Sequence, residues 1–200
     1  MTTEEKNILT EIKAIRAVYQ KLFEFLPSFA VTDKNVLPYG LKPHTRSVSW
    51  LVEQVITQQT KYRKDILGLD AVDFDMPDTC LHDCEMIKDK KSYYVNIKVH
   101  NIGGKENKND IAAVEKLYMQ YSANPAYNLI YACFGIRFDN ITIHFDSAYI
   151  RLFSPQFMPI YVNPRNDKIQ AFYEHESEYR SRNEFLQLLR ENSTSIKLPN

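Results

Sequence analysis

The stretch that most constrains the fold is residues 82–100, "HDCEMIKDKKSYYVNIKVH", in which apolar and polar side chains alternate on both sides of a short polar turn. Alternation with a period of two is typical of a half-buried β-strand. A turn at Asp89–Lys90 places Lys88 opposite Lys91, so the numbers of facing residues sum to 179. A slip of one residue would bury the charged side chains, and the pattern therefore predicts an antiparallel hairpin in this register.

This register gathers polar groups on one face of the hairpin. It sets Asp83 opposite Asn96 and Glu85 opposite Tyr94, and facing residues have Cβ atoms about 4.5–5.5 Å apart. Because side chains alternate along a strand, Lys98 shares the face of Asn96. The other face is apolar and is expected to pack on the core.

The rest of the chain predicts an α+β fold with a central mixed, antiparallel-rich sheet flanked by helices. Helical spacing of apolar residues predicts helices over 4–26, 45–62 and 110–122. A last helix is predicted to start at "SRNE", where Ser181 and Glu184 fit a capping box. Strands are expected over 82–88, 91–100, 127–136, 140–145 and 148–153, with a turn at Asp139–Asn140. We expect one domain over 1–200: a helical part (1–62, for dimerisation), a sheet (63–160) and a C-terminal segment with a helix (161–200).

Composition excludes several classes of function. The chain has only 5 glycines and contains no glycine-rich phosphate-binding motif. Cys80, Cys84 and Cys133 do not have the partners of a zinc site and are read as reduced thiols. The first residues do not resemble a signal peptide, and no apolar run approaches 18 residues, so we expect a soluble protein of the cytoplasm without a membrane partner. Lys plus Arg equals Asp plus Glu, at 25 each, which neither favours nor excludes nucleic acid.

The clustered acids and lysine suggest chemistry on a phosphate. Two neighbouring carboxylates repel each other, and oxygen ligands of this kind suit Mg²⁺. A bound metal ion polarises a phosphoryl oxygen and lowers the pKa of bound water, and a lysine on the same face stabilises developing negative charge. The alternative is a polar strand face that is open to solvent.

Residues 83–101, "DCEMIKDKKSYYVNIKVHN", resemble the metal-binding hairpin of the PD-(D/E)XK nuclease superfamily, in which an acid is followed thirteen positions later by another acid, one residue and a lysine. The resemblance is to type II restriction endonucleases of the EcoRV, HincII and SwaI type. "HTRSVSWLVEQVI" (44–56) is similar to the helix that precedes the hairpin, and "YRSRNEFLQLL" (179–189) to the start of the C-terminal helix. The resemblance implies a restriction-endonuclease-like fold and a homodimeric, Mg²⁺-dependent endonuclease, with Mn²⁺ as a substitute cation.

The resemblance also assigns roles in the site. Asp83 is the expected metal ligand, Lys98 the expected catalytic lysine, Ile97 a donor of its backbone carbonyl to the metal, and Glu53 a candidate acid on the preceding helix. Position 96, expected to be an acid and a metal ligand, is Asn. Three explanations stay open: a substitution introduced to block cleavage, replacement of the missing carboxylate by Glu85, or a naturally weak nuclease.

The expected partner is double-stranded DNA with a short palindromic site, cut once per strand to leave 5′-phosphate and 3′-hydroxyl ends. A dimer matches the symmetry of such a site. Alternatives are another PD-(D/E)XK DNA nuclease and a non-catalytic DNA-binding protein on the same fold. Candidate DNA contacts are Lys42, His44, Arg46, Asn101, Lys105, Asn107, Lys108, Asn109, Arg165, Arg180 and Arg182.

Overall fold

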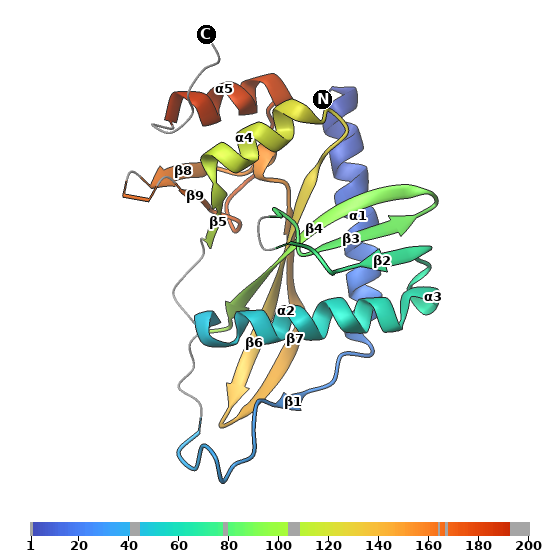
Figure 1. Ribbon diagram of the computed structural model, residues 1–200, viewed down its shortest axis with the longest axis vertical. Helices are drawn as coiled ribbons and strands as arrows, with labels where there is room; N and C mark the ends of the chain where they lie inside the picture. The colour runs from blue at the N-terminus through green and yellow to red at the C-terminus, as the bar shows by residue number, and fades with distance from the viewer. Residues whose placement is uncertain are drawn as a thin grey trace.

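The computed structural model describes residues 2–40, 45–77, 80–103, 109–163, 165–166 and 168–192. The fold is α+β (Figure 1). The helices are α1 (Thr3–Phe23), α2 (Thr45–Tyr62), α3 (Lys64–Leu67), α4 (Val114–Ala123), the 3₁₀ turn η1 (Pro155–Phe157) and α5 (Arg182–Asn192). The strands are β1 (Phe29–Ala30), β2 (Ala71–Asp73), β3 (Cys84–Lys88), β4 (Lys91–Asn101), β5 (Asn109–Ala113), β6 (Leu129–Asp139), β7 (Thr142–Phe153), β8 (Ile160–Asn163) and β9 (Lys168–Ala171).

Two sheets organise these strands. The larger has the order β1-β7-β6-β4-β3-β2 and the smaller the order β5-β9-β8. In the larger sheet β4 runs parallel to β6, and the other neighbouring strands are antiparallel. The parallel pair needs a long crossover, and the segment containing β5 and α4 provides it. The larger sheet is therefore mixed and flanked by helices, as the sequence predicts.

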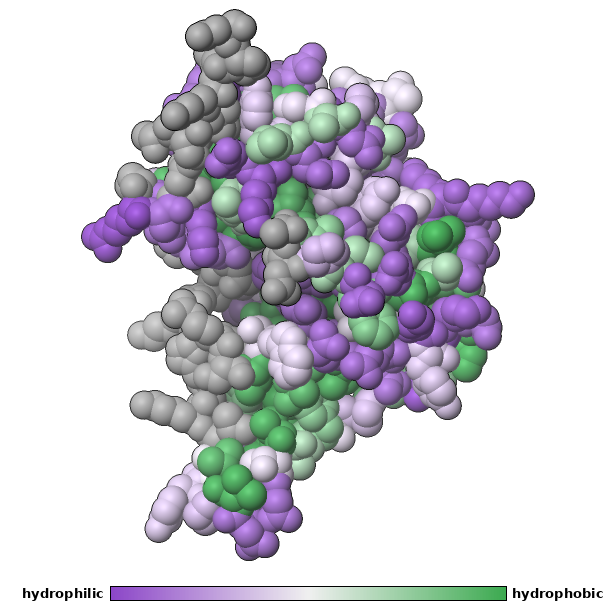
Figure 2. All heavy atoms as spheres, viewed as in Figure 1, coloured by the Kyte–Doolittle hydropathy of each residue, from purple (hydrophilic) through white to green (hydrophobic). Residues whose placement is uncertain are grey.

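The two faces of the larger sheet bury different cores. On one face, Val95 and Ile97 of β4 belong to a cluster that includes Ile15 of α1 and Val52 of α2. On the other face, Tyr131 and Cys133 of β6 pack with Ile169 of β9 and with residues of α4 and α5. Figure 1 shows α4 and α5 beside the smaller sheet, away from α2. In Figure 2, hydrophobic atoms gather low on the visible face, whereas the side that carries the hairpin is mostly polar.

Several element boundaries differ from the sequence prediction. The helix predicted over 110–122 begins at Val114, because the residues before it form β5 and pair with β9 of the smaller sheet. The strands predicted over 140–145 and 148–153 form a single strand, β7. Its pairing with β6 changes register once, at an irregularity between Phe134 and Ile136. The predicted turn at Asp139–Asn140 lies one residue later, since Asp139 pairs with Thr142. The strands β1, β2, β8 and β9 are too short to give a clear alternating pattern.

Candidate active site

The hairpin has the register that the sequence predicts. Cys84 faces Val95, Glu85 faces Tyr94 and Lys88 faces Lys91. Asp89 and Lys90 both adopt positive φ, at 51° and 63°, which is the backbone conformation of a tight two-residue hairpin turn. The apolar alternation and the turn together fix the position of every side chain on the two strands.

Asp83 immediately precedes β3 and is held by β4 through both its backbone and its side chain. Its backbone N–H donates to the carbonyl of Val95 at 2.9 Å. Its carboxylate Oδ2 accepts from the backbone N–H of Ile97 at 2.5 Å. Val95 and Ile97 are two residues apart, so their backbone groups point to the same edge of the strand. The carbonyl of Ile97 therefore points to the edge at which Asp83 lies.

Asn96 is buried beside Asp83, with only 7% of its surface exposed. Its amide Nδ2 donates to the carbonyl of Leu81 at 2.8 Å and lies 3.4 Å from Oδ1 of Asp83. Its other side-chain atom, Oδ1, is buried without a hydrogen-bond partner among the described residues. A buried acceptor of this kind is unfavourable unless water or a ligand occupies the space next to it.

Lys98 and Glu53 complete a cluster of charges around Asp83. Burial and the negative charge of Asp83 raise the pKa of Glu53 to about 7, while Lys98 opposes that rise. Burial raises the pKa of Asp83, and Lys98 and the Ile97 N–H act against it. Burial lowers the pKa of Lys98, against the charges of Asp83 and Glu53. Residues from α2, from the start of β3 and from β4 therefore lie close enough to influence each other's ionisation.

Tyr131 of β6 supports the lysine, and the sequence analysis missed this residue. In the parallel pairing of β4 with β6, Asn96 is level with Tyr131. The Nζ of Lys98 lies 5.6 Å from the centroid of the Tyr131 ring, and the ring is fixed by a hydrogen bond from its hydroxyl to the carbonyl of Ile111. The contact depends on which strand neighbours β4, and no local sequence signal gives that.

Glu85, the proposed replacement for a carboxylate at position 96, has different neighbours. It pairs with Asp73 of β2. Both acids act on His82, whose pKa is lowered mainly by burial and raised by Glu85 and Asp73. The His82 ring also lies 4.9 Å from the ring of Tyr94. Glu85 therefore belongs to a separate group with Asp73 and His82, next to the cluster formed by Asp83, Lys98 and Glu53.

Two of the predicted DNA contacts are not supported, because their guanidinium groups are used within the protein. Arg182 donates to the carbonyls of Tyr121, Asn124 and Tyr127 and to the side chain of Asn128. Arg180 donates to the carbonyls of Gln156 and Met158 and pairs with Glu178. Their side chains are only 13% and 14% exposed.

The other predicted contacts have varied outcomes. Asn101 ends β4, three residues after Lys98, and Arg165 is exposed in the turn between β8 and β9. Arg46 lies in α2 and Asn109 in β5, but their side chains are not described. The remaining candidates fall outside the described residues: Lys42, His44, Lys105, Asn107 and Lys108.

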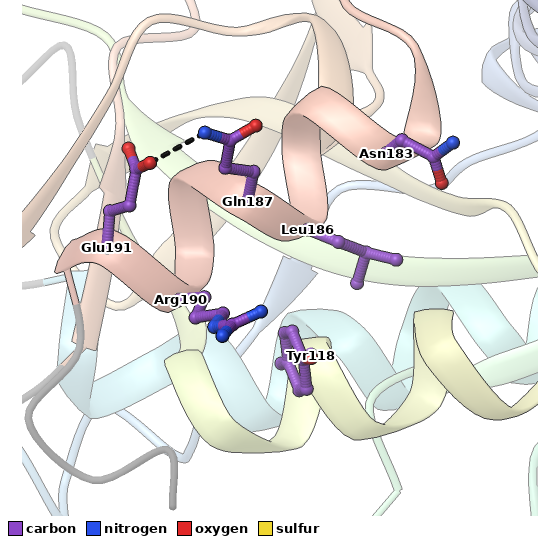
Figure 3. A pocket seen from close by; sticks show the side chains of 6 residues that line it. All are labelled: Tyr118, Asn183, Leu186, Gln187, Arg190 and Glu191. Atoms are coloured by element: carbon purple, nitrogen blue, oxygen red, sulfur yellow. Dashed lines mark hydrogen bonds between the residues drawn. The ribbon is translucent and has the colours of Figure 1, made fainter. Parts of the chain in front are cut away.

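A separate pocket of about 470 Å³ lies between α4 and α5 (Figure 3). It is lined by Tyr118, Asn183, Leu186, Gln187, Arg190 and Glu191. In Figure 3, Arg190 and Leu186 point from α5 toward Tyr118 on α4. The lining residues come from neither β3 nor β4, so this pocket is distinct from the cluster around Asp83.

No protein-family model and no curated protein sequence matches the chain. Within the described residues there is no group of three or more His, Cys, Asp or Glu side chains that could hold a metal ion. The same part of the chain contains no helix that is both long and apolar enough to cross a membrane.

Proposed function

We propose that the chain is a Mg²⁺-dependent type II restriction endonuclease of the PD-(D/E)XK superfamily, with a restriction-endonuclease-like fold. The observation that carries the proposal is the convergence of Glu53, Asp83 and Lys98 beside the buried, unpartnered oxygen of Asn96. These residues come from three separate segments, and ionisable groups with perturbed pKa values concentrate at functional sites.

The donor set suits a hard cation. Oxygen atoms are available from the Asp83 carboxylate, the Asn96 amide and the Ile97 carbonyl, and Mg²⁺ prefers oxygen ligands while retaining several waters. The Oδ1 of Asn96, which has no partner among the described residues, is the specific sign of fit, because a cation or its bound water would satisfy it. The neutral amide contributes no charge, so we expect weaker cation binding than a second carboxylate would give.

The reaction that this set supports is hydrolysis of a phosphodiester by in-line attack of water. When bound, the cation polarises a phosphoryl oxygen and lowers the pKa of water. Lys98, held over the Tyr131 ring, stabilises negative charge that develops on the phosphate. Asp83 is held in place by the hydrogen bond that its carboxylate accepts from Ile97. The products are a 5′-phosphate and a 3′-hydroxyl.

The proposed substrate is double-stranded DNA with a short palindromic site, bound by a homodimer in which each copy cuts one strand. A symmetric dimer places two equivalent sites on two equivalent strands. Asn101 and Arg165 are the described candidates for DNA contact that remain from the sequence analysis.

The second candidate is a non-catalytic DNA-binding protein on the same framework, and the hydrogen bonding of Asn96 favours it. The amide donates to the carbonyl of Leu81 and lies within reach of Asp83. An aspartate here would instead bring a negative charge against two acceptors. Without a cation, therefore, asparagine suits this position better than aspartate does.

The test is to replace Asn96→Asp and to incubate both proteins with plasmid DNA and Mg²⁺. The Asp variant is expected to cut the plasmid into discrete fragments, and the unmodified protein to cut it slowly or not at all. Asn183→Asp, the same change at an exposed position of α5, is the control and should not alter cleavage. Adding Lys98→Met to the Asp variant should abolish cutting.

The outcomes separate the candidates. Absence of cleavage by every variant, together with tight sequence-specific binding, would favour the non-catalytic protein. A continuous smear of nicked DNA would point to a nuclease without sequence specificity.

A further inference from the structure

Arg151 lies on the same row of the sheet as the proposed catalytic lysine. Lys98 of β4 is level with Cys133 of β6, and Cys133 is level with Arg151 of β7. Residues that are level on neighbouring strands point to the same face, and strands are about 4.8 Å apart. The backbones of Lys98 and Arg151 are therefore separated by about 10 Å across the sheet.

The Arg151 side chain is exposed and rests on a stack of rings. Its guanidinium carbon is 4.9 Å from the centroid of the Tyr149 ring. Tyr149 is stacked in turn on His100, with centroids 4.6 Å apart and planes within 8° of parallel. The Tyr149 hydroxyl donates to Glu174 at 2.6 Å. The ring that supports Arg151 is thus held by a stacking partner and a hydrogen bond.

Gly135 creates the space for this stack. It is level with His100 in the pairing of β4 and β6. A Cβ atom at this position would lie 2.6 Å from the Cβ of Tyr149 and 2.8 Å from Cδ1 of Ile102. The irregular pairing between β6 and β7 occurs at the same place, between Phe134 and Ile136. The missing side chain and the irregularity together let Tyr149 lie against the sheet next to His100.

Among the described residues, the hydrogen-bond donors of Arg151 have no acceptor, unlike those of Arg137 and Arg182. Within the described residues, its guanidinium lies over the ring of Tyr149, and no carbonyl or carboxylate accepts a hydrogen bond from it. Arg137, by comparison, is paired with Asp146, and Arg182 donates to four oxygen atoms. Within the part of the chain that the structure describes, Arg151 is therefore a positioned cation that no acidic side chain pairs with.

We propose that Arg151 binds a backbone phosphate of the substrate DNA, on the strand whose scissile phosphate lies at Lys98. The inference rests on the proposed function. A guanidinium group matches a phosphate with two parallel hydrogen bonds. Phosphates of one DNA strand rise 3.4 Å per nucleotide along the helix axis. Two long cationic side chains whose backbones are about 10 Å apart can therefore contact different phosphates of the same strand. The contact fixes the position of the DNA backbone and does not read its sequence.

Glu174 allows a second test, in which a substitution should strengthen DNA binding and not weaken it. It is exposed and accepts a hydrogen bond from the Tyr149 hydroxyl, so its negative charge lies at the hydroxyl end of the ring that supports Arg151. A glutamine at 174 still accepts that hydrogen bond but no longer repels a phosphate. Loss of charge at 151 should weaken DNA binding, and loss of charge at 174 should strengthen it.

The experiment measures binding of a fluorescently labelled DNA duplex by anisotropy, without divalent cation, over a series of NaCl concentrations. We expect Arg151→Gln to raise Kd about tenfold, the usual effect of losing a hydrogen-bonded contact to a charged group. The slope of log K against log salt should fall by about 1. Arg151→Lys should restore the slope and only part of the affinity, and Glu174→Gln should lower Kd about twofold.

Arg190→Gln is the matched control, since it removes one exposed positive charge from α5. If Arg151→Gln and Arg190→Gln bind the duplex equally, the Arg151 proposal is wrong although the proposed function stands. If the unmodified protein binds no duplex even at low salt, both proposals are overturned. Circular dichroism of each variant checks that the fold is retained.

Discussion

Two buried groups of polar side chains differ in how completely they are satisfied. Around Arg182, one guanidinium donates to three carbonyls and an amide oxygen, stacks over the ring of Tyr121, and lies 3.7 Å from Glu4. Around Asp83, the pKa values of two acids are raised, the pKa of the lysine is lowered, and one amide oxygen has no partner within the described residues. The first group joins four segments of the chain, whereas the second holds three ionisable side chains whose pKa values are all shifted chiefly by burial.

The contrast separates polar groups that hold the fold from those available for function. The carbonyls of Tyr121 and Asn124 lie at the end of α4, where helix carbonyls have no partner within the helix, and Arg182 supplies donors to them. The Asp83 group instead keeps acids and a lysine together in a partly dry environment at some cost in stability. Strain of this kind is usual at sites that bind a ligand or perform chemistry.

The largest expected effect is at Arg182. Arg182→Ala leaves four buried or partly buried acceptors without their donor, and each unsatisfied group costs about 1–3 kcal/mol. We expect the free energy of unfolding to fall by about 3 kcal/mol or more, measured by urea denaturation. Arg190→Ala, at an exposed residue of the same helix, α5, should change it by less than about 0.5 kcal/mol. If Arg182→Ala lowers the free energy of unfolding as little as Arg190→Ala does, the contrast between the groups around Arg182 and Asp83 is wrong.

A smaller effect, an increase in the free energy of unfolding, is expected for a substitution at Glu53. Its pKa in the folded protein is raised to about 7 from an ordinary value near 4.5. Folded protein therefore keeps a proton that unfolded protein releases, and stability is lost as pH rises from about 4.5 through 7. Glu53→Gln cannot ionise, so it should match the unmodified protein at pH 4.5 and exceed its stability at pH 8. The gain should be about 1 kcal/mol after allowance for solvent screening at this half-exposed group.

Urea denaturation at the two pH values measures this difference. Glu176→Gln, at an exposed position, is the control and should leave both unfolding curves unchanged. A gain for Glu53→Gln that is equal at pH 4.5 and pH 8 would mean that the carboxylate charge is not its source.

The sequence predicts the hairpin well because its information is local. Alternation of apolar residues and a polar two-residue turn are enough to give the register from Cys84–Val95 to Lys88–Lys91, beside which Asp83 lies next to Asn96. The capping box of Ser181 with Glu184 is also present as predicted. Arg182 shows the limit. Its acceptors lie 54 to 61 residues away, and nothing in the residues around it shows that a helix end comes close. The roles of Tyr131 and Arg151 likewise depend on the order of strands in the sheet.

The smallest expected effect on the free energy of unfolding is at Lys90, in the hairpin turn. It tests whether the stability of the hairpin backbone is independent of the charged group around Asp83. Lys90 occupies positive φ, which disfavours a side chain and suits glycine. Its backbone N–H donates to Asp70, and Lys90→Gly keeps that bond. The relief of strain is partly offset by the greater freedom of glycine in the unfolded chain, so we expect a gain of about 0.5 kcal/mol. Because no charge of the Asp83 group is changed, this gain should be the same at pH 4.5 and pH 8, in contrast to that of Glu53→Gln. A gain in stability that varies with pH would show that the turn and the charged group around Asp83 are coupled. The charged group could then not be treated as independent of the hairpin that carries it.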